Sequence, residues 1–432
     1  MSINAVELLK SSLFKETFIY TATDMMGKAM SFVLLPIMSF YMLPSELGIA
    51  TNFSVLAQLV ILLAGLAIVN GMPYFFYEQR KKENTQMVSN LLVLCISLCL
   101  ILSVCVLLFH QQVNQYFQLN LKVQLLSIFF VLGSLITQID LVILRLENKA
   151  KHFAYLQIIQ ILLHTLIVVL FVIVLELGGI GKIYAEVIVL SLIGILHLFI
   201  LIKKGYIKCH YEWKWIKALL KFGVPLLPHS VSFWFKGGMD KVLITSYCGL
   251  QFNGLYSMAI SISSIFTLLV NSFFSAYTPY LQKRLSQTNI EELWDLKCKI
   301  VKQTYLLCFL FIVVALFSLG ASWIIFVYMI DKKYLPAFDY MPLIIFANYI
   351  YLVYSFTIQY IYKMKKTLIM GIITFTGSII QVLLSYILIR QHGVMGAIYS
   401  FAIGNIIISI GIAIYSYIVF PMPWISGLFK KR

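Results

Sequence analysis

The sequence predicts an all-α integral membrane protein that crosses the bilayer about twelve times. Hydrophobic residues make up 61% of its 432 residues and charged residues only 12%, whereas a soluble domain carries roughly 25% charged residues. The mean hydropathy is +0.92. A chain this apolar cannot bury its side chains in one aqueous core, so lipid must be its main solvent. Long apolar runs and the placement of the basic residues predict the same fold class.

Apolar runs long enough to cross a membrane recur along the whole chain. A spanning helix needs about 20 predominantly apolar residues, and the run from Met87 to Phe109 meets this requirement without a single charge. By this criterion, spans are expected near residues 17–42, 47–70, 87–109, 122–144, 153–175, 180–202, 220–247, 250–277, 303–330, 339–362, 367–389 and 393–420.

The basic residues alternate between loops as they do in a membrane protein with both ends in the cytoplasm. If the N-terminus is cytoplasmic, the loops and ends on that side hold 25 of the 33 lysines and arginines, and the opposite loops hold five. Cytoplasmic loops carry such an excess of Lys and Arg. The asymmetry therefore predicts that both termini are cytoplasmic. It also supports the span count, because one missed helix would disturb the alternation.

A basic, amphipathic segment divides the chain into two halves of six expected spans. It places Trp213, Ile216 and Leu219 at helical spacing, with lysines between them. This pattern predicts a helix in the membrane interface, its apolar face in lipid and its lysines near anionic headgroups. Two halves with the same orientation are a recurrent transporter plan. We expect an N-terminal six-helix bundle over 1–202, a cytoplasmic interfacial linker helix over 203–221 and a C-terminal six-helix bundle over 222–432.

Ionisable side chains inside the apolar runs are functional candidates, because a charge in the membrane is costly unless it is paired or hydrated. Asp24 and Lys28 lie four residues apart in the first span, so they share one helical face. Lys236 and Asp240 do the same in the seventh, where Asp240 and the adjacent Lys241 are expected near the outer, hydrated end.

Two explanations of these charges remain open. The pairs either neutralise each other as intrahelical salt bridges, or they line a hydrated cavity whose cations receive an anionic substrate. The second is favoured because lysines outnumber aspartates in the set. The substrate-cavity candidates are Asp24, Lys28, Lys236, Asp240 and Lys241.

Three further polar residues of the expected spans are considered: Glu186, His164 and Asp140. Glu186 and His164 are candidates for ion coupling, although packed polar groups facing the bundle are the commoner case. Asp140 is interpreted as part of a solvated helix end together with Arg145 and Glu147. The sequence shows no nucleotide-binding or hydrolase motif and no Cys/His ligand spacing. No catalytic residue, metal or cofactor is therefore expected, and the protein is predicted to be a transporter rather than an enzyme.

Several stretches spread over nearly the whole chain are similar in sequence to one bacterial family. They are LLPIMSFYMLPSELGIATNFSVLAQL from Leu34, RLENKAKHFAY from Arg145, KFGVPLLPHSVSFWFKGGMDKVLITSYCGLQFNGLYSMAISI from Lys221 and GVMGAIYSFAIGN from Gly393. With these residues the chain resembles the Wzx-type O-antigen and polysaccharide flippases, a family of the multidrug/oligosaccharidyl-lipid/polysaccharide (MOP) superfamily.

The resemblance implies a fold, a substrate and partners. The fold would be two six-helix bundles around a central cavity, as in multidrug (MATE) transporters of that superfamily. The substrate would be an undecaprenyl-pyrophosphate-linked oligosaccharide, flipped from the cytoplasmic to the periplasmic face of the inner membrane for lipopolysaccharide or other surface polysaccharide. The cavity would be cationic, with Asp240 and Lys241 at the family's acidic-then-basic position. The partners implied are membrane lipids, a glycan polymerase and a chain-length regulator, and no nucleic acid.

Other functions are weighed against this one. A drug/cation antiporter of the same superfamily should carry acidic cavity residues, whereas lysines dominate here. A peptidoglycan-precursor flippase would have two further spans. A membrane-embedded glycan polymerase would carry a large polar outer loop, whereas the expected outer loops are short. An ion gradient is the expected energy source, because no nucleotide site is recognisable.

Overall fold

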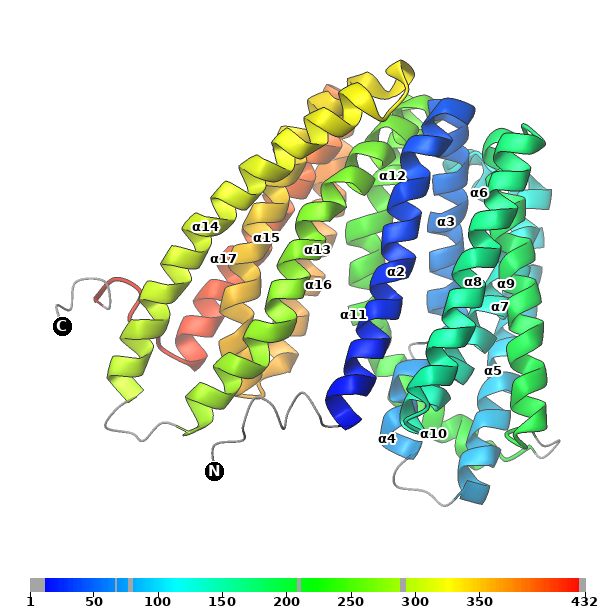
Figure 1. Ribbon diagram of the computed structural model, residues 1–432, viewed down its shortest axis with the longest axis horizontal. Helices are drawn as coiled ribbons and strands as arrows, with labels where there is room; N and C mark the ends of the chain where they lie inside the picture. The colour runs from blue at the N-terminus through cyan, green and yellow to red at the C-terminus, as the bar shows by residue number, and fades with distance from the viewer. Residues whose placement is uncertain (1–11, 67, 77–80, 208–210, 288–292, 427–432) are drawn as a thin grey trace. The chain divides into compact units, whose positions relative to one another are not determined.

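The computed structural model describes residues 12–66, 68–76, 81–207, 211–287 and 293–426, and every regular element in these ranges is a helix (Figure 1). Ten helical segments among them are long and apolar enough to cross a membrane. They are Pro44–Gly65, Glu83–Leu108, Leu121–Leu146, Ala150–Val174, Gly178–Lys203, Leu250–Ser286, Trp294–Tyr328, Lys332–Lys363, Thr367–His392 and Val394–Val419. Each coincides with a run predicted from the sequence, and the all-α membrane fold is confirmed.

The first and seventh expected spans have a different character. The first is a continuous helix, α2 (Ser12–Tyr41), which carries Asp24 and Lys28 and so is less apolar than the ten. The seventh is broken into short helices around Pro225 and Pro228. The total of twelve spans and the cytoplasmic location of both termini stay predictions. Six of the basic residues on which the orientation partly depends lie outside the described residues: Lys10, Arg80, Lys208, Lys430, Lys431 and Arg432.

Contacts divide the chain into two compact units, Met1–Trp234 and Phe235–Arg432. The bundle boundaries predicted from the sequence stay predictions, and residues 208–210 of the predicted linker are outside the described ranges. Besides α2, the helices of the first unit are α3 (Pro44–Gly65), η1 (Ile68–Gly71), α4 (Met72–Phe76), α5 (Lys81–Leu108), α6 (His110–Phe117), α7 (Leu121–Leu146), α8 (Ala150–Val169), η2 (Leu170–Val174), α9 (Gly178–Lys203), α10 (Trp213–Gly223), η3 (Val224–Leu226) and α11 (Leu227–Trp234).

Helices α7 and α9 form the closest pair in the first unit. A Cβ on Gly133 would lie 2.2 Å from the Leu190 carbonyl oxygen, and one on Gly194 would lie 2.5 Å from the Gly133 Cα. The two backbones therefore touch where both helices lack side chains. Small residues at such a contact give membrane helices their van der Waals packing, because lipid supplies no hydrophobic force between them.

Helix α10 confirms the predicted amphipathic helix but corrects its environment. Ile216 and Leu219, which were expected to face lipid, are 5% and 0% exposed. They belong to a face that packs on α5 and η1, whereas Trp213 is exposed. The amphipathic pattern reports that one face is apolar, and it does not distinguish burial in lipid from burial in protein.

The second unit is held together by polar side chains that reach from one helix to the backbone of another. On α17, Asn405 and Ser416 donate to the carbonyl oxygens of Ala347 and Thr357 on α15. Interhelical bonds of this kind satisfy polar groups away from water. The helices of this unit are η4 (Phe235–Met239), α12 (Asp240–Cys248), α13 (Leu250–Gln287), α14 (Leu293–Tyr328), η5 (Lys332–Tyr340), α15 (Met341–Lys363), α16 (Thr367–His392) and α17 (Val394–Val419).

Candidate functional site

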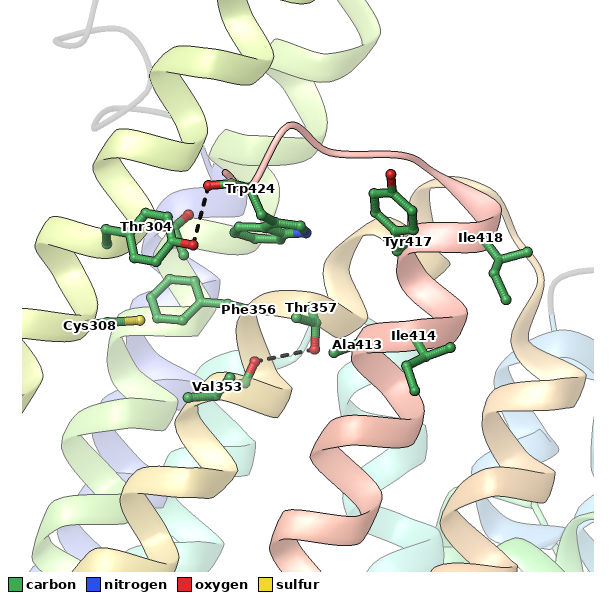
Figure 2. Close-up of a pocket in the computed structure, with 11 residues that line it drawn as sticks. Thr304, Cys308, Val353, Phe356, Thr357, Ala413, Ile414, Tyr417, Ile418 and Trp424 are labelled. Carbon is green, nitrogen blue, oxygen red and sulfur yellow. Dashed lines mark hydrogen bonds between the residues drawn. The ribbon is translucent and has the colours of Figure 1, made fainter. Parts of the chain in front are cut away.

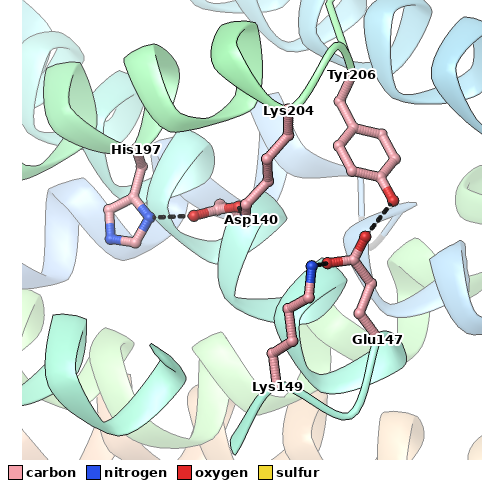
Figure 3. A network of polar contacts seen from close by, with 6 residues as sticks. All are labelled: Asp140, Glu147, Lys149, His197, Lys204 and Tyr206. Atoms are coloured by element: carbon pink, nitrogen blue, oxygen red, sulfur yellow. Dashed lines mark hydrogen bonds and ion pairs between the residues drawn. The ribbon is translucent and has the colours of Figure 1, made fainter. Parts of the chain in front are cut away.

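A buried charged cluster joins α7 to α9 in the first unit (Figure 3). The Asp140 carboxylate accepts from His197 Nδ1 at 2.8 Å and from Lys204 Nζ at 3.0 Å. The side chains of Asp140 and His197 are 0% and 1% exposed, and that of Lys204 is 24% exposed. Because an ionised carboxylate only accepts, His197 must carry its proton on Nδ1. Its Nε2 is buried and has no hydrogen-bond partner among the described residues.

The spacing along α9 explains this geometry. His197 and Lys204 are seven residues apart, which is two helical turns, so both project from one face. Asp140 lies near the end of α7, opposite that face. Lys204 follows the last residue of α9, and its long side chain reaches back to the carboxylate while staying partly accessible.

The structure corrects the interpretation of Asp140 as part of a solvated helix end. Asp140 is fully buried, and its counter-ions come from a helix distant in sequence. His197 was not identified from the sequence at all. The signal was present, since an imidazole lies well inside an apolar run, and any ionisable group at that depth is a functional candidate.

A second polar group continues this cluster outside the spans. The Glu147 carboxylate accepts from the Tyr206 hydroxyl at 2.6 Å and pairs with Lys149 at 2.9 Å. Burial and the bond to Glu147 raise the pKa of Tyr206. Burial alone would raise the pKa of Glu147, but hydrogen bonds from Lys149 and Tyr206 outweigh it, so that pKa is lowered. Glu147 is therefore held ionised where the α7–α8 turn meets the segment after α9.

We expect Glu147→Gln to weaken the fold in a pH-dependent way. At pH 7 the variant should lose about 1 kcal/mol of unfolding free energy, the typical net value of a hydrogen bond. Folding lowers the pKa of Glu147. Its contribution to the unfolding free energy is therefore complete at pH values above its pKa in the unfolded chain, about 4.3, and is lost as the pH falls through its pKa in the folded protein. Denaturation in micelles from pH 7 to pH 3 should show the two proteins converging on the acid side. A difference that stays constant with pH would contradict this role.

The first-span candidates do not pair with each other. Asp24 forms an ion pair with Arg145 at 3.3 Å, and each side chain is 46% exposed. The Arg145 guanidinium also lies 4.6 Å from the centre of the Phe153 ring. Lys28 is exposed and makes no ion pair among the described residues. An exposed pair such as Asp24–Arg145 contributes little stability. The less favoured explanation, a salt bridge between Asp24 and Lys28, is not what the structure shows, and Lys28 is open to another anion.

The two candidates for ion coupling lie on neighbouring helices of the same unit. Glu186 on α9 pairs with Lys182 at 3.8 Å, one turn away. His164 is half-buried on α8. A relay through them stays a prediction.

In the second unit, Asp240 begins α12 at the centre of a buried polar cluster. Its carboxylate accepts from the Ser385 hydroxyl at 2.6 Å and from the Gln381 amide at 3.5 Å, and Ser385 also contacts Ser400 at 2.6 Å. Asp240 is 2% exposed, so the expectation that it lies near water is wrong. The polar atoms of this cluster are carboxylate and hydroxyl oxygens and one side-chain amide. Such a set of ligand atoms suits a proton or a hard cation better than a soft metal.

Lys236 lies in the π-helical turn η4 that precedes Asp240. Its ammonium nitrogen is 4.6 Å from the centre of the Tyr351 ring, and Tyr351 stacks on Tyr354 with ring centres 5.0 Å apart. No ion pair of Lys236 exists among the described residues. A π-turn holds one residue more than an α-turn, so the four-residue spacing no longer puts Lys236 and Asp240 on one face. The less favoured explanation, a salt bridge between Lys236 and Asp240, is therefore not what the structure shows, while Lys241 is half-buried beside Asp240.

The sequence and the fold both match known proteins. A protein family described as polysaccharide biosynthesis protein matches residues 13–285, which is more than half of the chain. The chain belongs to this family. One curated relative, Lsg locus putative protein 1 of Haemophilus influenzae (strain ATCC 51907 / DSM 11121 / KW20 / Rd), is 21% identical over 288 residues, covering 64% of this chain and 68% of its own length.

Two solved structures share the fold of this chain. The lipid II flippase MurJ, in an inward closed conformation, aligns with a TM-score of 0.72 and 16% identity over 92% of this chain and 87% of its own. A multidrug-resistance MATE transporter of the MOP superfamily, in an inward-facing conformation, aligns with a TM-score of 0.70 and 15% identity over 90% and 94%. This polysaccharide biosynthesis family member is therefore a multi-pass membrane protein with a transporter fold.

Proposed function

We propose that this protein is a flippase for undecaprenyl-pyrophosphate-linked oligosaccharides in a bacterial inner membrane. It carries repeat units from the cytoplasmic to the outer face, where a polymerase and a chain-length regulator use them for O-antigen or another surface polysaccharide. Membership of the polysaccharide biosynthesis family supports the glycan. The likeness to a protein named lipid II flippase supports a lipid-linked substrate.

The observation that carries the proposal is the lysine without a counter-ion in the second unit. Lys236 is partly buried within the helices, and its ammonium group lies over the Tyr351 ring without an ion pair among the described residues. A cation in such a place is costly unless an anion joins it. A pyrophosphate provides that anion, and charge-assisted hydrogen bonds to phosphate oxygens are among the stronger polar contacts.

The other candidates are proposed substrate contacts, each within its own unit. Lys28 is an exposed cation in the first unit, and Lys241 is the second lysine near the start of α12. The stacked rings of Tyr351 and Tyr354 next to Lys236 offer flat apolar surfaces to sugar rings. Asp24, which pairs with Arg145, and Asp240, whose carboxylate accepts from the Ser385 hydroxyl, are the acidic members of the proposed set.

The energy source is proposed to be an ion gradient. The cation could be bound by Glu186 with His164, or by the oxygen-rich cluster around Asp240. A drug/cation antiporter would also use a buried carboxylate. Asp240, however, is enclosed by Ser385 and Gln381, whereas a drug cation needs an open acidic surface, so the flippase is the better-supported function.

Replacing Lys236 with alanine should reduce flipping about tenfold or more, because a charge-assisted contact to phosphate is worth roughly 1.5–3 kcal/mol. The variant is expressed in a host lacking the chromosomal gene, and surface glycan is measured at matched protein level. Lys236→Arg should retain most activity, and the control Lys283→Ala, an exposed lysine of α13, should be unaffected.

The side of the membrane on which substrate collects distinguishes the functions. In the gene deletion, complete polyprenyl-linked units should accumulate on the cytoplasmic face while surface glycan disappears. Units that reach the outer face but remain unpolymerised would favour a polymerase. An unchanged glycan in Lys236→Ala would remove Lys236 from the substrate site without deciding the function.

A further inference from the structure

An apolar cavity of about 450 Å³ lies in the second unit, between α14, α15, α17 and the segment that follows α17 (Figure 2). Its walls include Cys308 from α14, Phe356 from α15 and Ala413 from α17, and Trp424 lies at one end. The described helices that form it are all candidate membrane spans. The cavity therefore lies against three candidate membrane spans and the segment after the last of them.

Three of the polar side chains in the walls are already engaged. The Thr304 hydroxyl donates to the Ile300 carbonyl oxygen of its own helix, and the Thr357 hydroxyl is within bonding distance of the Val353 and Tyr354 carbonyl oxygens. The Tyr305 hydroxyl donates to the Trp424 carbonyl oxygen. What these groups leave for an occupant is mainly hydrocarbon and aromatic surface, which fits an apolar chain.

The surface around the cavity is apolar as well. Phe309 on α14 is 66% exposed, and Ile414 and Ile418 on α17 are 57% and 71% exposed. On a spanning helix, exposed side chains of this kind face lipid. The cavity thus opens among side chains that contact acyl chains.

One end of the cavity is basic. Lys297 lies seven residues before Thr304, so it is two turns along the same face of α14 and about 10 Å away along the axis. Its ammonium group donates to the Pro421 carbonyl oxygen at 2.8 Å and lies 4.3 Å from the centre of the Phe420 ring. Lys299 and Lys302 are exposed on the same two turns, where Asp295 is the one carboxylate among the described residues, while Glu291 and Glu292 lie just outside the described ranges. This is the end predicted to be cytoplasmic.

We propose that this cavity binds one acyl chain of an anionic phospholipid from the cytoplasmic leaflet, with its phosphate beside Lys297 and Lys299. The lysines lie beyond one end of the cavity, just as the headgroup of a phospholipid lies beyond one end of its acyl chain. Basic residues near the membrane surface attract anionic headgroups. The α14 wall from Thr304 to Cys308 spans only about one helical turn. A short stretch of one chain fills such a slot, and the proposal is independent of the transported substrate.

Lipid retention by the full-length protein tests the site. The protein is equilibrated in micelles with equal phosphatidylglycerol and phosphatidylcholine, and bound lipid is counted by native mass spectrometry. One phosphatidylglycerol should be retained with about fivefold preference, the factor expected from one lysine near an anionic headgroup. Ala413→Phe, which fills the cavity, and Lys297→Gln should each lose it. Ile387→Phe on lipid-facing α16 and Lys283→Gln are the matched controls.

Tryptophan fluorescence keeps the test decisive if Ala413→Phe folds poorly. Brominated phosphatidylglycerol should quench the tryptophan fluorescence of the wild-type protein more than that of Trp424→Phe. The difference between the two is the quenching of Trp424. Brominated phosphatidylcholine should give a smaller difference. Equal retention of both lipids, or equal quenching, would show only a general lipid annulus and overturn the proposal. Displacement of phosphatidylglycerol by undecaprenyl phosphate at equal concentration would also overturn it, by assigning the cavity to a polyprenyl chain.

Discussion

Asp140→Ala is expected to lower the free energy of unfolding by about 3 kcal/mol, the lower end of the cost of removing one partner from a buried ion pair. The loss arises because His197 and Lys204 both depend on this carboxylate. Lys204 is partly accessible and can turn toward water, which limits the cost. Denaturation of the purified protein in mixed micelles measures the change. Accumulation in the membrane should fall in parallel.

A double-mutant cycle separates this ion pair from simple loss of packing. The double variant Asp140→Ala/Lys204→Met should lose clearly less unfolding free energy than the sum of the losses of the two single variants. The reason is that residues in one network couple by about 0.5–3 kcal/mol. Asp140→Asn should lie between wild type and Asp140→Ala, since its amide oxygen can still accept from His197. Strict additivity, or an Asp140→Ala protein as stable as wild type, would show that the cluster does not hold α7 and α9 together.

Gly133→Leu is expected to prevent stable folding of the first unit, and Gly133→Ala to cost about 1–3 kcal/mol, the usual range for overpacking. The added carbon meets the backbone carbonyl of Leu190 rather than a flexible side chain. The two helices can relieve this contact only by moving apart, which also pulls His197 from Asp140. Denaturation in micelles and the yield of monodisperse protein measure the effect.

The matched controls are Gly320→Ala on α14 and Gly371→Ala on α16. A Cβ at either position meets nothing within 4 Å. Alanine should leave these helices unchanged or slightly more stable, because it forms helix better than glycine by roughly 1 kcal/mol. If all three alanine variants behaved alike, glycine flexibility rather than the close approach of α7 and α9 would be the cause.

The membrane fold was predictable from the sequence because it depends on local, additive properties. A run such as Met87–Phe109 is recognisable without knowing its neighbours. The partners of Asp140 were not predictable, because they depend on which helices pack together, and His197 lies 57 residues away. For the same reason Ile216 was assigned to lipid although it is buried in protein.

Local irregularity limited the prediction of the candidate site. The four-residue spacing of Lys236 and Asp240 implies one face only in a regular α-helix, and the π-turn η4 changes that register. Nothing in the residue types of Phe235–Met239 requires a π-turn. Lys236 was nevertheless recognised as a candidate, because the cost of a charge in the membrane does not depend on helix type.

The distance in sequence between Asp140 and its partners also has a consequence in time. His197 and Lys204 follow Asp140 by 57 and 64 residues. At about 5–20 residues per second, a ribosome needs roughly 3–13 s to make that length. During this interval α7 carries a carboxylate whose counter-ions have not yet been synthesised. The contact between α7 and α9 that this cluster makes can therefore form only after α9 has been synthesised.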